Sequence, residues 1–391
     1  MPGSARAQDW DPLSVEAMED PVRIQSQLRD QCPVAWTERG SGFWSIFRYE
    51  DITGVARDPE GSTQGRPQRG SARPPLEVNP PRHTEYRTLL RPYFTSAAIA
   101  AKESTVRDLV VERLDPLIAA GGGDFARGFT YPLPTQVICN LLRLPEDASD
   151  LVNDLSDQIY LNEDGRGGDP AAVVNAERSL TTLAGSVVSE RRRSPQDPEV
   201  DLISGLIAGT IEGTPLSDDQ IVDVLRLLFV AGHNSTTSSL GICFLALAQH
   251  PDWQRRLRAE PTLIPGAIDE FLRLETPVMA MPRTVARPTE LHGVAMQPGD
   301  QLFLVWAAGN RDGHQFRDPD QCQIERRPKT TLSFGRGIHA CLGRGLAELE
   351  LRVACEELLN RSTNIEVAGP VRRSTWVRFG VSELHLRVLS R

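Results

Sequence analysis

Residues 217–249 are the longest stretch of the chain with a helical pattern, and they constrain the fold more than any other segment. Residues 217–220 (Ser-Asp-Asp-Gln) have the spacing of a capping box and place acids in the first turn. His250-Pro251 then ends the pattern. At 1.5 Å per residue, one continuous helix of this length measures about 50 Å, enough to cross a whole domain.

The remaining patterns predict a mainly α fold with a smaller β-rich lobe. Helices are expected at 21–31, through most of 82–208, at 253–274 and at 342–359, and an irregular loop at 61–81. Residues 34–37 and 43–47 flank a glycine-containing turn and predict a β-hairpin. No repeat or low-complexity linker divides the chain. We therefore expect a single domain over 1–391, with the β-rich lobe at about 34–47, 277–308 and 364–391.

Composition and charge exclude several classes of partner and location. The formal net charge of −9 and the pI near 5.4 disfavour nucleic acid and anionic membranes as partners. No run approaches the roughly 20 apolar residues of a membrane helix. The N-terminal segment also lacks the apolar core of a signal peptide. We expect a cytoplasmic protein that binds neither nucleic acid nor membrane.

The six cysteines indicate neither zinc nor iron–sulfur sites, because none forms a Cys-x-x-Cys pair. Five of them are expected to be ordinary thiols, most of them buried. Cys341 differs, because it follows a glycine-rich segment (334–340) at the start of the last predicted helix. Backbone N–H groups at a helix start favour a thiolate. Such a thiolate can be a nucleophile or a single axial metal ligand, and a haem iron needs only one strong protein ligand.

The segment around Cys341 resembles the haem-binding signature of the cytochrome P450 family. Phe334, Gly337, Cys341 and Gly343 stand at the places where that signature has Phe, Gly, Cys and Gly. The resemblance implies haem b as cofactor, Cys341 as the axial thiolate, Phe334 and Gly343 against the haem, and the P450-like form of the mainly α fold.

Two further motifs occur in the family's order. Glu270 and Arg273, at i and i+3 of one helix, can pair with each other and match the family's structural Glu-x-x-Arg motif. The family often has a third arginine where this chain has Gln321, which leaves open whether Arg326 or Arg327 replaces it.

The resemblance also assigns residues to the haem propionates. His83 and Arg87 match one propionate-binding segment, and Arg283 and His339 match two others. Charge-assisted donors of this kind suit buried carboxylates.

Within the long predicted helix, residues 230–237 (Val-Ala-Gly-His-Asn-Ser-Thr-Thr) weaken helix propensity, so a kink is expected there. The family has an acid and a threonine here that relay protons during oxygen activation. This chain has Asn234 in place of the acid and Ser235 in place of the threonine, with Thr236 about 100° further round the helix. An amide cannot shuttle a proton by titrating.

The resemblance therefore implies a monooxygenase that inserts one oxygen atom of O₂ into a small hydrophobic substrate by hydroxylation, epoxidation or O-dealkylation. Because of Asn234, a peroxygenase, an oxidative coupling enzyme or a dehydratase/isomerase remains an alternative. A non-catalytic haem-binding sensor is a third possibility from a different class.

The substrate pocket and the electron donor are expected from the family's order of elements. The pocket is expected to include Val230, Ala231, Val278, Met279, Ala280 and Trp376. The chain leaves no room for a fused reductase, so electrons are expected from a ferredoxin or flavodoxin with its own reductase. Such an acidic partner is expected to dock on arginines near Cys341, namely Arg91, Arg336, Arg344 and Arg352.

Overall fold

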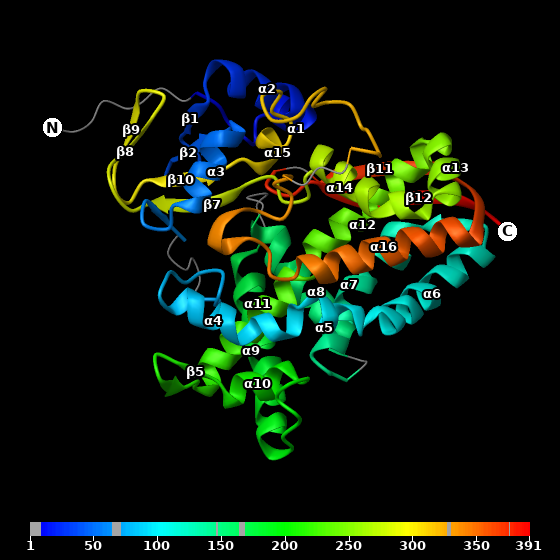
Figure 1. Ribbon diagram of the computed structural model, residues 1–391, viewed down its shortest axis with the longest axis horizontal. Coiled ribbons are helices and arrows are strands. Elements are labelled where there is room, and N and C mark those ends of the chain that lie inside the picture. Colours follow the sequence, from blue (N-terminus) through cyan, green and yellow to red (C-terminus); the bar gives the residue numbers. More distant parts are fainter. Residues whose placement is uncertain (1–8, 65–71, 146–147, 164–168, 327–329, 375) are drawn as a thin grey trace. The chain divides into compact units, whose positions relative to one another are not determined.

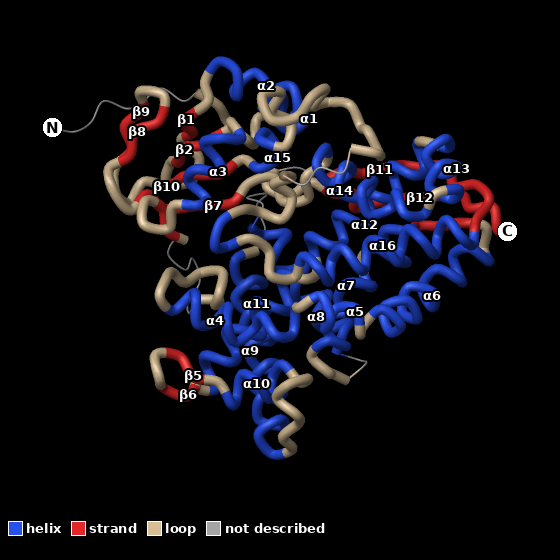
Figure 2. The backbone as a smooth tube through the Cα atoms, in the orientation of Figure 1, coloured by secondary structure: helices blue, strands red, loops and turns tan. Residues whose placement is uncertain are grey.

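The structure, a computed structural model, describes residues 9–64, 72–145, 148–163, 169–326, 330–374 and 376–391 (Figure 1). The chain divides into two compact units. The first comprises Met1–Arg66, Asp269–Cys341 and Thr375–Phe379, and the second comprises the rest. Helices predominate among the described residues, as Figure 2 shows. None of the described helices is both long and apolar enough to cross a membrane.

The first unit is built on a five-stranded sheet with the order β1-β2-β10-β7-β3. Its strands are β1 (Val34–Thr37), β2 (Phe43–Ile46), β3 (Ser62–Thr63), β7 (Met281–Val285) and β10 (Gln301–Leu304). The predicted hairpin is confirmed, because β1 and β2 pair antiparallel with Trp36 opposite Trp44. Gly42 in its turn has φ +80°, and a β-carbon there would collide with the Trp36 ring.

Short helices and a second hairpin complete this unit. They are α1 (Val15–Glu19), α2 (Pro21–Gln31), α3 (Tyr49–Arg57), α15 (Trp306–Gly309), the 3₁₀ turn η4 (Gly337–His339), β8 (Thr289–Leu291) and β9 (Val294–Met296). Side chains of the sheet, α3 and α15 form one buried apolar cluster, among them Trp44, Ile52 and Trp306.

The second unit contains most of the helices. Its first half holds α4 (Arg82–Leu90), η1 (Arg91–Phe94), α5 (Ser96–Ala100), α6 (Glu103–Ala119), η2 (Ala126–Thr130), α7 (Pro132–Leu141), α8 (Ala148–Glu163), α9 (Pro170–Arg193) and α10 (Leu202–Ala208). Its second half holds α11 (Asp218–Ala231), α12 (Asn234–Gln249), α13 (Pro251–Ala259), η3 (Pro261–Leu263) and α16 (Arg344–Arg361). Helix α14 (Ile264–Leu274) begins in this unit and ends in the first.

Small sheets accompany these helices. β11 (Ser362–Ser374), β12 (Gly380–Ser390) and β4 (Gly122–Asp124) form one sheet, and β12 packs on α12. β5 (Thr210–Ile211) pairs with β6 (Thr214–Pro215). The sequence analysis grouped residues 364–391 with the other strands, whereas the structure places this sheet among the helices of the second unit.

The long predicted helix begins as expected but is broken in the middle. The capping box at Ser217 and Gln220 is present. Helix α11 ends at Ala231 and α12 starts at Asn234, so the expected kink is a full interruption at Gly232 and His233. A β-carbon on Gly232 would lie 2.5 Å from the side chain of Ile138, so close packing against α7 requires glycine at the break.

Three other predicted boundaries need correction. The helical stretch 253–274 is divided at Glu260-Pro261, because proline cannot continue α13. The last helix begins at Arg344, two residues later than predicted, so Cys341 lies just before it. The β-rich segment predicted at about 277–308 has its first strand only from Met281, and Val278 makes an isolated bridge with Arg378.

Glu350 on α16 is a buried carboxyl group in the second unit. Glu350 is 2% exposed, and its Oε2 atom has no hydrogen-bond partner among the described residues. Burial raises the pKa of this carboxyl well above its usual value of 4.5. The folded protein therefore holds a proton that the unfolded chain releases near pH 4.5, and this contribution to stability is lost as pH rises.

We predict that Glu350→Gln weakens the fall in the free energy of unfolding as pH rises from 5 to 8. One such group contributes a slope of up to about 1.4 kcal/mol per pH unit. Urea unfolding across this pH range measures the slope. Glu348→Gln, a change at an exposed carboxylate of the same helix, is the control. Equal slopes in wild type and Glu350→Gln would contradict the prediction.

Candidate functional site

Cys341 ends a tight loop of the first unit. Its backbone N–H donates to the carbonyl of Phe334 over 2.9 Å, which closes the loop. Gly335 and Gly337 have φ of +69° and +74°, values that side chains disfavour. A β-carbon on Gly337 would also collide with the carbonyl oxygen of Ala56 in α3. The loop thus holds the Cys341 backbone in one position and needs its glycines to do so.

Cys341 is more exposed than the other cysteines. Of the six cysteines, all of which lie in described residues, only Cys341 is exposed. Burial raises the pKa of Cys139 and of Cys322 to about 12, so those two thiols stay protonated. Cys341 is therefore the thiol best placed to bind a metal ion or a cofactor.

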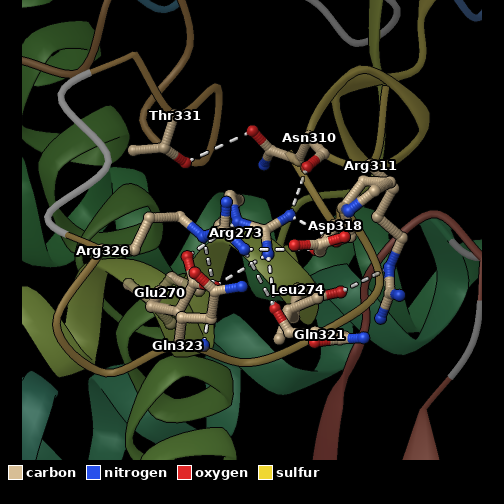
Figure 3. A network of polar contacts seen from close by, with 12 residues as sticks. Glu270, Arg273, Leu274, Asn310, Arg311, Asp318, Gln321, Gln323, Arg326 and Thr331 are labelled. Carbon is tan, nitrogen blue, oxygen red and sulfur yellow. Dashed lines mark hydrogen bonds and ion pairs between the residues drawn. The ribbon is translucent and has the colours of Figure 1, made fainter. Parts of the chain in front are cut away.

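A buried network holds the chain that leads into this loop (Figure 3). Glu270 and Arg273 on α14 form the predicted ion pair, with an Nε–Oε2 distance of 2.8 Å, and neither side chain is exposed. Arg273 also donates to the carbonyl oxygens of Asn310, Pro319 and Gln321.

The third arginine, which the sequence left open, is Arg326. Its Nε donates to Glu270 Oε1 over 2.9 Å. Arg327 lies outside the described residues. Gln321 takes part only through its backbone carbonyl, which accepts from Arg273 and Arg326. Its side chain does not take the place of the family's third arginine.

Asn310 carries the network to the loop. Its Oδ1 accepts from the N–H of Leu332 over 2.7 Å, and its Nδ2 donates to the hydroxyl of Ser333. Ser333 in turn donates to the carbonyl of Leu272 on α14. The residues directly before Phe334 are therefore fixed to the helix that carries Glu270.

Arg283 on β7 fits a carboxylate ligand. The residue is 4% exposed, and burial lowers the pKa of its guanidinium to about 10. Its Nη1 donates to the carbonyl of Pro282, and no carboxylate pairs with it among the described parts of the chain. A buried charge without a counterion is costly, so an anionic group would stabilise it. The predicted haem propionate has the required chemistry.

The other predicted cofactor residues are divided between the units. Phe334 and His339 are half-buried in the Cys341 loop of the first unit. His83 and Arg87 lie four residues apart on α4 of the second unit, and His83 is 4% exposed. Gly343 is the residue that precedes α16. The contacts of these residues with haem stay predictions.

The predicted proton-relay residues form the first turn of α12. Ser235 donates its hydroxyl proton to the carbonyl of Ala231 over 3.1 Å, while Thr236 is 4% exposed. Asn234 Nδ2 and Thr237 Oγ1 are buried and have no hydrogen-bond partner within the described ranges. Thr237 was not among the predicted relay residues, although it belongs to the polar run that indicated the kink.

The predicted pocket residues are also found in both units. In the first, Met279 and Ala280 are buried, and the N–H of Met279 donates to the carbonyl of Val377, beside Trp376. Val278 pairs with the same C-terminal segment through Arg378. In the second, Val230 is buried near the end of α11 and Ala231 is exposed. Their role in binding a substrate stays a prediction.

The arginines predicted to dock a partner are not equivalent. Arg344 pairs with Glu348 on its own helix and remains 41% exposed. Arg336 Nη2 lies 3.4 Å from the hydroxyl of Tyr49. Arg352 pairs with Glu103 over 2.6 Å, and this and other bonds lower the pKa of Glu103 to about 2.

Arg352 belongs to a group of paired charges that we call the α6–α16 charge lattice. Its members join the two helices through ion pairs: Arg107, Arg352, Arg361, Glu103, Glu356, Glu357 and Asp115. Figure 1 shows α16 running beside α6. The positive charge of Arg352 is therefore largely neutralised within the protein.

Comparison with known proteins places these features in a family. The family model described as Cytochrome P450 matches residues 170–363. A putative cytochrome P450 123 of Mycobacterium tuberculosis is 32% identical over 371 residues, covering 91% of this chain and 90% of the relative. Cyclomarin C epoxidase CymV of Salinispora arenicola is 33% identical and covers 83% and 85%. The solved structure of the Bacillus subtilis bacillaene synthase cytochrome P450 PksS has 27% identity, covers 97% of this chain and all of the other, and gives a TM-score of 0.89.

We predict that Arg326→Ala destabilises the protein much more than Gln321→Ala. Removing Arg326 leaves part of the buried Glu270 carboxylate without a partner, at a cost of about 3 kcal/mol. Gln321→Ala keeps the backbone carbonyl that the network uses, so it changes stability by less than about 0.5 kcal/mol. Denaturant unfolding of both variants measures the difference. Comparable losses would show that Arg326 is not the third member of the network.

Proposed function

Since the chain belongs to the cytochrome P450 family, whose members are haem-dependent monooxygenases, we propose that it inserts one oxygen atom of O₂ into a small hydrophobic molecule with electrons from a separate protein. Cys341 carries this proposal, because it is the one exposed cysteine and stands in a loop that only glycines permit. When bound, haem supplies the redox chemistry of oxygen activation. The thiolate of Cys341 would bind its iron, and Arg283 would neutralise a propionate.

The molecules named with three relatives support a proposal for the chemical class of the substrate. One relative is an epoxidase of cyclomarin C. Similar solved structures include a Bacillus megaterium protein with testosterone, at a TM-score of 0.84, and a mutant of P450 EryK with erythromycin B, at 0.85. We propose a largely apolar substrate, and testosterone is a suitable first probe for binding.

The electron donor is proposed to be a ferredoxin or flavodoxin that works with its own reductase. The exposed Arg344, beside the Cys341 loop, supports an acidic partner. Arg352 supports this less well, because its charge is held in the α6–α16 charge lattice. A cytoplasmic location, which such a donor requires, belongs to the same proposal.

Asn234 is the observation that keeps a peroxygenase as the second candidate. Its amide donates hydrogen bonds but cannot deliver a proton by titrating. Delivery of protons from water would then depend on hydroxyl groups such as that of Ser235. Because Ser235 gives its own proton to Ala231, its oxygen is left to accept a hydrogen bond from water.

We predict that Cys341→His abolishes the red-shifted Soret band that reduced thiolate-ligated haem gives with carbon monoxide, and with it substrate oxygenation. Imidazole is neutral and donates less charge to iron than thiolate does. The spectrum of the reduced, carbon monoxide-treated protein is the measurement. Cys32→Ser serves as a control at a half-buried cysteine. A thiolate-type spectrum in Cys341→His would refute the assignment.

We predict that Ser235→Ala raises the yield of hydrogen peroxide per dioxygen consumed by about twofold or more, the effect expected from losing one hydrogen bond. Asn234→Asp should make this yield depend on pH, because a titratable group enters the site. An oxygen electrode and a peroxide assay, run with a surrogate ferredoxin and reductase, give the ratio. If Thr236→Ala has the effect and Ser235→Ala does not, Thr236 holds the water instead. Efficient turnover with peroxide alone would favour the peroxygenase.

A further inference from the structure

Behind the break between α11 and α12 lies a buried chain of polar side chains that the proposed function does not use. His233 occupies the break itself. Thr135 lies on α7 and Asn153 on α8, and all three residues are less than 5% exposed. Tyr131 precedes α7. All four belong to the second unit, so their contacts are internal to it.

The contacts form a closed circuit. His233 Nδ1 lies 2.8 Å from Thr135 Oγ1, and Thr135 donates to Asn153 Oδ1. The Tyr131 ring packs edge-on against the His233 ring with 5.0 Å between centroids. The Tyr131 hydroxyl donates to the carbonyl of Asn153 over 3.4 Å. His233 is thus held by a hydrogen bond along the ring plane and by an aromatic contact.

This circuit determines the tautomer of His233. A threonine hydroxyl has one proton, and Thr135 gives that proton to Asn153, whose Oδ1 can only accept. Thr135 Oγ1 must therefore accept from His233, which requires a proton on Nδ1. In the neutral ring, Nε2 is then the nitrogen without a proton.

Because His233 lies directly before α12, the circuit affects the position of the first turn of that helix. At a helix break the usual N–H to carbonyl bonds are interrupted, so the direction of the following helix depends on other contacts. Asn234 and Ser235 follow His233 directly, and the carbonyl of His233 accepts the N–H of Thr237 in the first turn of α12. Fixing His233 therefore fixes the turn that carries Ser235.

We propose that His233 is a positioning residue for oxygen activation, and that its Nδ1–H bond to Thr135, itself held by Asn153, sets the direction of the Ser235 hydroxyl. The proposal rests on the proposed function, since it concerns proton delivery by that hydroxyl. It accounts for a buried histidine next to Asn234. The circuit ties the break to α7 and α8, so the geometry of the break does not depend on α11 and α12 alone.

The first experiment compares Thr135→Val with Thr130→Val in the haem-loaded protein, reduced by a surrogate ferredoxin and reductase, without substrate. Thr130 is equally buried in the second unit, but its hydroxyl donates only to the carbonyl of Ala126. We expect Thr135→Val to raise hydrogen peroxide per dioxygen about twofold or more, as loss of one hydrogen bond implies. Thr130→Val should match wild type, and Thr135→Ser, which keeps the hydroxyl, should restore the wild-type ratio.

A double-mutant cycle separates positioning from general damage. If Thr135 acts through Ser235, Thr135→Val adds no further peroxide in a Ser235→Ala background, whereas independent effects multiply. Asn153→Ala, at the other end of the circuit, should repeat the result and replaces Thr135→Val if that variant does not fold. Multiplying effects, or a ratio in Thr135→Val equal to that in Thr130→Val, would overturn the proposal.

The tautomer is tested without turnover. Nitrogen-15 spectra of the reduced carbon monoxide form, with His233 assigned by means of His233→Gln, should show the proton on Nδ1. A proton on Nε2 alone would overturn the circuit even in an active monooxygenase. A wild-type protein that consumes no dioxygen with reductant would instead contradict the proposed function, so the two failures are distinguishable.

Discussion

The buried ion pair of Glu270 with Arg273 is the interaction on which the Cys341 loop depends. Both charges are fully buried, so each is tolerable only because the other, together with Arg326, offsets the loss of hydration. The guanidinium of Arg273 also donates to the backbone carbonyls of Asn310, Pro319 and Gln321. These bonds hold a segment without regular structure against α14. Asn310 extends this order to the residues just before the loop. The residues before the loop are thereby fixed to α14 although they have little regular structure.

Sequence patterns predicted the features that depend on residues close together in the chain. The capping box at Ser217, the hairpin around Gly42 and the pairing of Glu270 with Arg273 each depend on residues a few positions apart, and each is present. The family resemblance, which is confirmed, added the fold and the cofactor that composition alone does not indicate.

Contacts between distant segments were the part that the sequence did not predict. Arg326 takes the role of the third arginine, which the family often has at the position of Gln321. Its contact with Glu270 depends on how the chain turns after α14, which no periodic pattern encodes. Gly232, at the break between α11 and α12, lies close to Ile138, a residue far away in sequence. His233 was visible in the polar run, but its bond to Thr135 joins residues 98 positions apart. Such partners become known only when the packing of the helices is known.

The α6–α16 charge lattice has a consequence for how this surface can evolve. Each of its arginines is already matched by a carboxylate, so the positive charge is present but hidden. Arg107 and Arg352 each have another carboxylate partner besides Glu356, so the loss of Glu356 alone would leave both arginines paired. The charge that this face presents is therefore set by its acids as much as by its bases.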